Sequence, residues 1–351
     1  MNSNKEFLNY IHFFRGFAIV IIVGIHCRIS LPWSEDQVLG RTIFTTLLDN
    51  GTVLFVFIAG FLFQYLKNKY QFNSYFKRKL RFVILPYLLI SIPILLYKYL
   101  FPQEYPWLPS SLAEMPYIIK AGYMILTGKH IGPFWFIPMI FIFYLISPLL
   151  VKIDQPKFYS FVFPILFLGG LFTFRFGYYS TIIDSFIHYL PIYIFGMWAA
   201  SQRHEIIRIK KPWVVLLIIL YVIIAFLEVI NVISIPKLTD FISSSTLPYF
   251  AFNWAKLKAC ILCIICLRIF YMYNEKNSKV LKILADDSFG IYFVHMYFIT
   301  LIEYVLNKYY PIELNVVYFI LYIMIVTLGS IISIEIVKKI MGSKSRMVIG
   351  S

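Results

Sequence analysis

Long apolar runs alternate with short polar segments along almost the whole chain. Ten of these runs reach the roughly 17–25 residues that a helix needs to cross a bilayer. They are 10–30, 43–66, 81–101, 133–152, 158–176, 180–200, 212–233, 248–271, 284–306 and 314–337. The pattern therefore predicts an all-α, polytopic membrane protein of about ten transmembrane helices, with residues 1–351 forming a single domain.

Two segments of this pattern have a character of their own, the first apolar run and the longest connection between runs. The first run continues to about Leu31 without a small-residue cleavage site, so we expect a retained span rather than a signal peptide. The longest connection, 98–132, opens with several prolines that break a helix. After them, 111–127 is predicted to be a short interfacial helix on the outer leaflet. It either covers an opening on that side or simply packs on the membrane.

Composition excludes an ordinary soluble protein. The chain is 60% hydrophobic and only 14% charged, with a mean hydropathy of +0.77, whereas soluble domains are about 25% charged. Lipid must therefore cover much of the surface. Three of the four cysteines, Cys260, Cys263 and Cys266, lie in one apolar run, where they are expected to act as small hydrophobes rather than as a disulfide framework.

The net charge of +15 is a topology signal. Lys and Arg concentrate in alternate connections, notably 67–81, 203–211, 268–282 and 338–346. Because basic residues stay on the cytoplasmic side, both termini are predicted to be cytoplasmic. The excess charge then anchors loops and attracts anionic lipid headgroups, and no nucleic-acid partner is expected.

Two polar side chains interrupt the first apolar run, at Arg15 and His26. They are eleven residues apart, which is three helical turns plus about 20°, so they share one face and stand about 16 Å apart along the axis. An ionisable residue inside a span is a functional hypothesis by default. The alternative is an arginine that reaches the headgroups together with a histidine satisfied by a neighbouring helix.

Arg78 and Arg81 stand at the cytoplasmic start of the third run. Their spacing places both guanidinium groups on one helix face, where they could bind phosphate oxygens. Ordinary anchoring by basic residues on the inner side explains them equally well.

Ser288, Tyr292 and His295 form a polar stripe at the start of the ninth run, because they follow i, i+4, i+7 spacing. Ser288 could be a helix cap, but His295 lies too deep for that explanation. Trp135, where the fourth run begins, is either an interface anchor or part of a pocket. Lys256 and Lys258 lie inside the eighth run, where a lysine must either snorkel or find a partner, and Glu228 is one candidate partner.

In this order, the motifs resemble the acyltransferase 3 family of integral-membrane O-acyltransferases over nearly the whole chain. Family members carry Arg-x10-His, Arg-x-x-Arg and Ser-x-x-x-Tyr-x-x-His, which match the residues above. The fourth-span pattern is matched by Trp135, 143–145 and Pro148. Ala59 replaces a serine of the family pattern, and 138–142 lacks the glutamates that many members carry, so no carboxylate role is supported in that span. The chain looks more like the branch that acts on surface polysaccharides.

The resemblance implies an enzyme of the bacterial cytoplasmic membrane. It would move an acetyl or other acyl group from acetyl-CoA to a hydroxyl of an extracytoplasmic glycan or lipid-linked sugar, without a metal. His26 would be the general base, and Arg15, Arg78 and Arg81 would bind the phosphates of the donor. Ser288, Tyr292, His295 and Trp135 would line the substrate pocket.

A glycan transporter or exporter is the main alternative hypothesis. Transporters commonly contain inverted repeats and helices broken near the midplane. The sequence shows no internal repeat, although Pro86, Pro93, Pro138 and Pro191 could break helices. A purely structural membrane protein is a third hypothesis, and it gives no reason for an arginine and a histidine inside a span.

Overall fold

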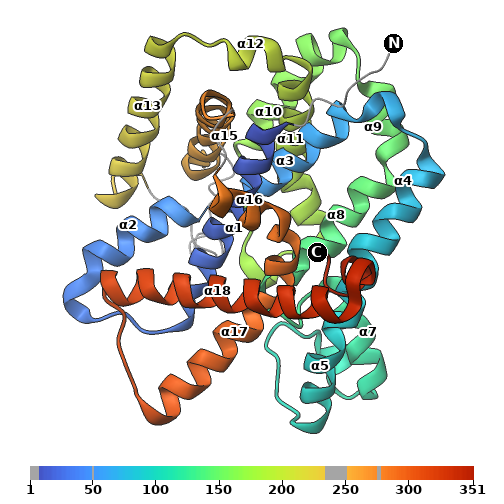
Figure 1. Cartoon of the computed structure of the whole chain (residues 1–351), viewed down its shortest axis with the longest axis vertical. Helices are drawn as coiled ribbons and strands as arrows, with labels where there is room; N and C mark the ends of the chain where they lie inside the picture. The colour runs from blue at the N-terminus through green and yellow to red at the C-terminus, as the bar shows by residue number, and fades with distance from the viewer. Residues whose placement is uncertain (1–7, 50, 234–250, 275–277) are drawn as a thin grey trace.

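The computed structural model describes residues 8–49, 51–233, 251–274 and 278–351. Throughout these residues the regular structure is helical, apart from one isolated bridge between Trp33 and Leu314 (Figure 1). The first residues of the eighth predicted run, 248–250, lie outside the described part. So do the basic residues Lys5, Lys237 and Lys276, of which Lys276 belongs to the basic connection 268–282.

The helices follow one another as short and long segments joined by brief turns. They are α1 Asn9–Ser30, α2 Val38–Leu48, α3 Gly51–Tyr65, α4 Phe72–Lys79, α5 Leu85–Leu100, α6 Ser110–Ala113, α7 Tyr117–Thr127, α8 Phe136–Leu145, α9 Ser147–Ile153, α10 Phe163–Gly170, α11 Ile182–Ser201, α12 Arg203–Ile207, α13 Lys211–Val229, α15 Trp254–Met272, α16 Lys279–Asp286, α17 Ser288–Tyr309, α18 Val316–Met341 and α19 Ser345–Val348. Five 3₁₀ turns accompany them, Glu35–Gln37, Lys67–Lys69, Gly132–Trp135, Gly177–Tyr179 and Gly342–Lys344.

Seven helical segments in the described part are long and apolar enough to cross a membrane. They are Asn9–Ser30, Glu35–Tyr65, Phe72–Leu100, Ile182–Ser201, Lys211–Val229, Ser288–Tyr309 and Val316–Val348. The pair Tyr117–Thr127 and Gly132–Leu145, bent by 69°, makes an eighth if it is one span. The predicted all-α, multi-pass membrane fold is thus confirmed. The number of ten spans and the cytoplasmic termini stay predictions.

Prolines explain where the long helices are irregular. The segments Leu80–Ile84 and Phe158–Val162 are π-helical, and each ends two residues before a proline, Pro86 or Pro164. Proline donates no hydrogen bond and its ring clashes with the carbonyl four residues earlier, so the helix widens there. The segment predicted as one interfacial helix, 111–127, consists of α6 and α7, with Pro116 preceding α7.

Helix α1 lies within the bundle and packs against α2, α3, α15, α16, α17 and α18 (Figure 1). The most intimate helix pair is α3 with α11, because glycines let the two backbones meet. A Cβ on Gly60 would come within 2.0 Å of the Tyr193 carbonyl oxygen, and one on Gly196 within 2.1 Å of the Phe57 oxygen. Small residues at such crossings are typical of membrane helices.

A buried carboxylate joins three segments on the predicted inner side. Asp154, just after α9, pairs with Lys67 and accepts hydrogen bonds from Gln64 at 2.8 Å and Tyr159 at 2.7 Å. Burial by itself raises the pKa of Asp154, but these hydrogen bonds and the Lys67 charge outweigh it and lower that pKa. The carboxylate is therefore held ionised at neutral pH.

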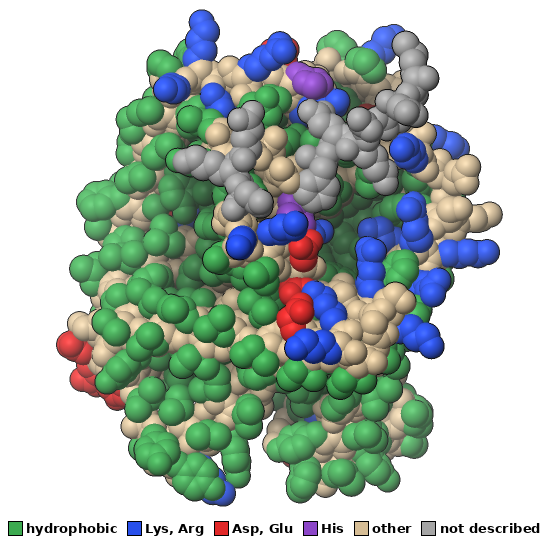
Figure 2. All heavy atoms as spheres, viewed as in Figure 1, with side chains coloured by type: hydrophobic (Ala, Val, Ile, Leu, Met, Phe, Trp, Pro, Cys, Tyr) green, Lys and Arg blue, Asp and Glu red, His purple; other side chains and the backbone are tan. Residues whose placement is uncertain are grey.

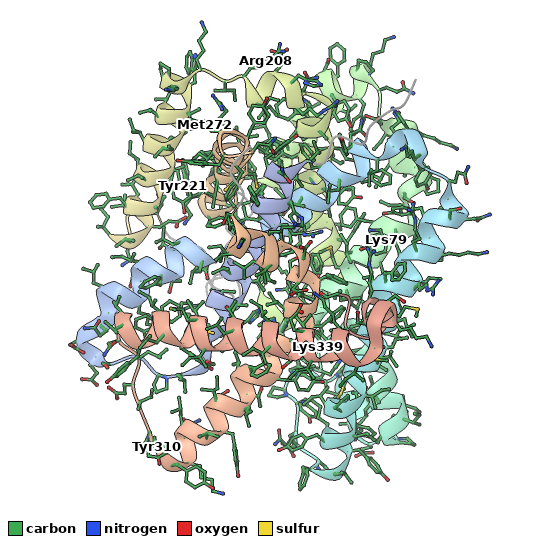
Figure 3. All side chains as sticks on the ribbon, viewed as in Figure 1. Lys79, Arg208, Tyr221, Met272, Tyr310 and Lys339 are labelled. Carbon is green, nitrogen blue, oxygen red and sulfur yellow. The ribbon has the colours of Figure 1, made fainter. Side chains whose placement is uncertain are left out.

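Apolar side chains cover much of the visible surface, and basic ones gather over α4 (Figure 2). Helix α13 exposes a broad apolar face that includes Val215, Leu216, Ile219, Leu220, Val222, Ile223 and Phe226. Arg208, after α12, and Tyr310, after α17, stand at opposite ends of the molecule (Figure 3).

Candidate active site

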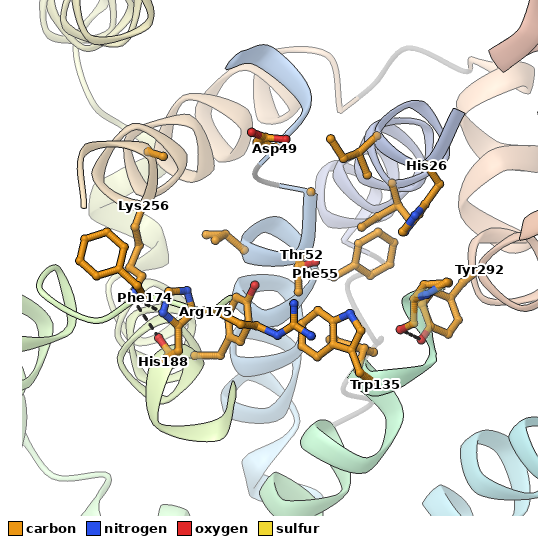
Figure 4. Close-up of a pocket in the computed structure, with 18 of the residues that line it drawn as sticks. His26, Asp49, Thr52, Phe55, Trp135, Phe174, Arg175, His188, Lys256 and Tyr292 are labelled. Carbon is orange, nitrogen blue, oxygen red and sulfur yellow. Dashed lines mark hydrogen bonds between the residues drawn. The ribbon is translucent and has the colours of Figure 1, made fainter. Parts of the chain in front are cut away.

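A cavity of about 320 Å³ lies between the helices and the loops that join them (Figure 4). Its lining comes from α1, α3, α8, α11, α15 and α17, from the 3₁₀ turn Gly132–Trp135 and from the loop after α10. The residues that line it are Ile22, Ile25, His26, Asp49, Gly51, Thr52, Val53, Phe55, Pro133, Trp135, Phe136, Phe174, Arg175, His188, Tyr189, Asn253, Ala255, Lys256, Phe289 and Tyr292. Segments that are distant in the sequence thus build one site.

Two imidazole rings meet at one end of this cavity. His26 lines the wall from α1, and the ring of His295 on α17 lies beside it, with 5.3 Å between the ring centroids. His295 is completely buried and is not part of the lining. The two histidines chosen from sequence are therefore neighbours, with His26 toward the cavity and His295 behind it.

Hydrogen bonding sets the tautomer of His295. Its Nδ1 lies 2.9 Å from the Ile291 carbonyl oxygen. Because a carbonyl oxygen only accepts, Nδ1 carries the proton and Nε2 is an acceptor. Within the described part of the chain this buried Nε2 has no hydrogen-bond partner. The ring that carries this acceptor thus lies next to the His26 ring.

Tyr292 and Trp135 line the same cavity, as predicted for pocket residues. The Tyr292 hydroxyl donates to the Pro133 carbonyl at 2.7 Å, which ties α17 to the 3₁₀ turn that carries Trp135. The Trp135 ring stacks on Tyr189, with centroids 5.8 Å apart and planes at 22°. These contacts fix the wall between the two ends of the cavity.

Arg15 and Ser288 meet outside the cavity, at the break between α16 and α17. Arg15 donates to the Ala285 carbonyl oxygen through Nε at 3.1 Å and Nη2 at 2.6 Å, and Ser288 Oγ donates to the same oxygen at 2.9 Å. The carbonyls at a helix end need such donors. Arg15 and His26 both face the α16–α17 segment, so they share a face of α1 as the spacing predicts.

At the end of the cavity away from His26, cationic side chains converge. Arg175 lies over Trp135, with its guanidinium carbon 3.4 Å from the ring centroid. Lys256, 2% exposed, donates to the carbonyls of Gly170 at 2.7 Å and Thr173 at 3.1 Å, and its Nζ lies 3.0 Å from Nδ1 of His188. Lys258 instead forms a buried ion pair with Glu228, the partner suggested by the sequence.

Arg78 and Arg81 belong to a separate basic cluster at the surface. Both are exposed, and Arg81 shares the Phe82 ring with Arg346 from α19, at 5.4 Å and 4.6 Å. Lys79 reaches over the Tyr144 ring at 4.7 Å. Arg346 also interacts electrostatically with Arg15. The cluster and Arg15 thus lie toward one side of the molecule, although none of these residues lines the cavity.

Comparison with protein families decides the identity. A family model described as an acyltransferase domain, that of acyltransferase 3, matches residues 8–335, nearly the whole chain. The chain belongs to the acyltransferase 3 family. It is therefore a membrane acyltransferase, and the family predicted from the sequence motifs is confirmed. No curated protein and no solved structure matches the chain.

The cavity of the acyltransferase is also lined by residues that the sequence patterns did not select as site residues. Arg175 and His188 belong to none of the sequence motifs, and the sequence marks Lys256 only as a cation inside an apolar run. Their common signal was an ionisable side chain in or beside an apolar run. In the part of the acyltransferase that the structure describes, no group of three or more His, Cys, Asp or Glu residues is placed to hold a metal ion.

Proposed function

We propose that this acyltransferase moves an acetyl group from acetyl-CoA to a hydroxyl of an extracytoplasmic glycan or lipid-linked sugar, in the cytoplasmic membrane. The observation that carries the proposal is the position of His26. It lies near the carboxyl-terminal end of α1, which is predicted to face outward, on the wall of a cavity large enough for a small ligand. A second imidazole ring lies beside it. The resemblance to the polysaccharide-modifying branch supports the choice of acceptor.

In the proposed reaction His26 acts as the general base. It removes the proton of the acceptor hydroxyl, and the oxygen attacks the carbonyl carbon of the thioester. The carbon–sulfur bond then breaks, and the departing thiolate takes up the proton. Imidazole suits this role because its ordinary pKa lies near neutral pH.

His295 supports the base from behind. Its ring lies beside His26 and its Nε2 is an acceptor. In the proposal this Nε2 accepts a hydrogen bond from the His26 ring during the reaction and orients the opposite nitrogen toward the cavity. When His26 becomes protonated, the same acceptor stabilises the imidazolium. His295 is thus a positioning residue in this proposal rather than a group that touches substrate.

The basic cluster is the proposed binding site for the donor phosphates. Arg78 and Arg81 are exposed and gather with Arg346 on the side predicted to be cytoplasmic, where acyl-CoA is made. Arg15 has two nitrogens on the Ala285 carbonyl. In the proposal it therefore holds α1 against α16, and so sets the distance between the phosphate site and His26.

Two variants test the proposal in purified protein, with free thiol released from acetyl-CoA as the readout. His26→Ala should lower kcat by about 10²–10⁴-fold, the usual contribution of a general base, while the protein stays folded. Arg78→Ala should raise KM for acetyl-CoA and leave kcat nearly unchanged.

Arg208→Ala is the matched control, because Arg208 is an exposed arginine after α12, away from the cluster (Figure 3). It should behave like the wild type. Unchanged acetylation of the surface polysaccharide in a His26→Ala strain, measured by NMR of the isolated glycan, would contradict the base role.

A further inference from the structure

The proposed base occupies one end of the cavity, and the opposite end holds positive charge that the reaction does not use. Arg175 comes from the loop after α10, Lys256 from α15 and His188 from α11, and all three line the cavity (Figure 4). Nitrogen-bearing side chains from three separate elements therefore converge on a space connected to His26.

The Arg175 side chain is held in place before any ligand arrives. Its plane lies over the Trp135 indole, and its Nε donates to Ser185 Oγ at 3.0 Å. Ser185 in turn donates to the Thr181 carbonyl at 2.9 Å. Cation–π contact and hydrogen bonding together orient the guanidinium, so little conformational freedom is left to lose when a ligand binds.

The loop that carries Arg175 is equally well anchored. Asn253 donates through its backbone N–H to the Leu171 carbonyl at 2.7 Å and through Nδ2 to the Thr173 carbonyl at 3.0 Å. Lys256 binds the same loop at Thr173, through its carbonyl and through Oγ1 at 2.7 Å. The start of α15 thus fixes the backbone just before Arg175.

The cavity lining carries an excess of cations. Of the described lining residues, Asp49 alone is a carboxylate, and its Oδ1 lies 3.8 Å from Nη2 of Arg28, which is not part of the lining. The hydrogen-bond partners of Lys256 among the described residues are carbonyls, a hydroxyl and an imidazole, all uncharged when that imidazole is neutral. A confined space with cations in its wall attracts anions.

We propose that Arg175 binds an anionic group of the acceptor sugar, a carboxylate or a phosphate, and so makes the enzyme selective for acidic acceptors. The guanidinium fork matches the oxygen geometry of both groups. The cavity volume is near the lower limit of small-molecule sites, which suits one sugar ring with one anionic substituent. The inference rests on the proposed function in one respect: that function identifies the anionic ligand as the acceptor sugar.

Three sugars that differ only at carbon 6 test the inference: glucose, glucuronic acid and glucose 6-phosphate. Binding to detergent-purified protein is measured by saturation-transfer NMR. The wild type should bind at least one acidic sugar about 10- to 100-fold more tightly than glucose, the range expected for a charge-assisted hydrogen bond. Preference for glucuronic acid indicates an acidic sugar, and preference for glucose 6-phosphate indicates a sugar phosphate.

Arg175→Gln should abolish this preference without weakening glucose binding, and Arg175→Lys should keep only part of it. Arg41→Gln, on the exposed face of α2 and outside the cavity, is the matched control and should keep all of it. If Arg175→Gln does not fold, the wild-type preference and its reduction in Arg175→Lys decide the question. Equal binding of glucose and the acidic sugars by the wild type overturns the inference.

His26→Ala separates this inference from the proposed function. It should lose acetyl transfer and still bind the acidic sugar through Arg175. If the wild type releases no thiol from acetyl-CoA but its binding of acidic sugars depends on Arg175, the anion site is supported and the proposed function fails. If transfer depends on His26 but Arg175→Gln keeps the preference for acidic acceptors, the proposed function is supported and the anion site fails.

Discussion

At the scale of single residues, the interpretation of His26 depends on its neighbour His295. His26 alone is a histidine in an apolar helix, for which a satisfied core position is the simpler interpretation. The ring centroid of His295 lies 5.3 Å from that of His26, and its acceptor nitrogen has no partner among the described residues. This neighbour gives His26 a second interpretation, the proposed one of a base with an orienting group beside it.

Substitution of His295 should therefore reduce turnover without affecting donor binding. We expect His295→Leu to lower kcat about 10-fold or more, which corresponds to about 1.4 kcal/mol, with KM for acetyl-CoA unchanged. His295→Asn keeps an acceptor at this position and should recover part of the loss. Steady-state kinetics on purified protein measures both. Equal losses in the two variants would mean that His295 only fills space.

Sequence patterns predicted this end of the cavity better than the other. Arg-x10-His and Ser-x-x-x-Tyr-x-x-His each lie on one continuous helix, so their spacing alone determines which side chains share a face. Arg175 lies instead in a loop and reaches the cavity because Asn253 and Lys256, about eighty positions later, hold that loop. Helical periodicity carries no information about such long-range contacts.

At the scale of helices, the contact between α3 and α11 positions two walls of the cavity. Thr52 and Phe55 come from α3, and His188 and Tyr189 come from α11. The apolar runs predicted both helices, but they did not predict that glycines would bring the pair into backbone contact. That pairing depends on which small residues face each other in three dimensions.

Gly60→Ala should therefore destabilise the protein. The added methyl group would meet the backbone of Tyr193 rather than a flexible side chain, and overpacking of this kind costs about 1–3 kcal/mol. The unfolding temperature in detergent, followed by size-exclusion chromatography after heating, should fall. Gly122→Ala is the matched control, because a Cβ there meets nothing within 4 Å. An equal effect in both variants would refute the close-packing argument.

At the scale of the whole molecule, the sequence predicted the class of fold and left the details of the spans open. Hydropathy found every helix that is long and apolar enough to cross the membrane in the described part. It treated 133–152 as one run, whereas the structure divides it into the 3₁₀ turn, α8 and α9, with Pro133, Pro138 and Pro148 near the starts of these three segments. Hydropathy detects the length of an apolar run but not the direction of the helix axis, so it does not predict where a helix bends.

The predicted orientation can be tested with single cysteines at the two ends of the molecule. Tyr310→Cys should react with an impermeant maleimide in intact cells, whereas Arg208→Cys should react only after the membrane is opened, because basic loops stay inside. The native cysteines, Cys27, Cys260, Cys263 and Cys266, are all buried and should give little background. Labelling of both variants in intact cells would contradict the topology.

The cavity has one further consequence for how the protein is made. Its lining begins at Ile22 and ends at Tyr292, so residues from both ends of the chain enclose the same space. Ribosomes deliver the chain from its amino terminus, and the wall is incomplete until α17 has entered the bilayer. A partly synthesised protein therefore offers His26 no enclosed chamber. Truncated chains that end before α17 lack the wall that the proposed reaction needs.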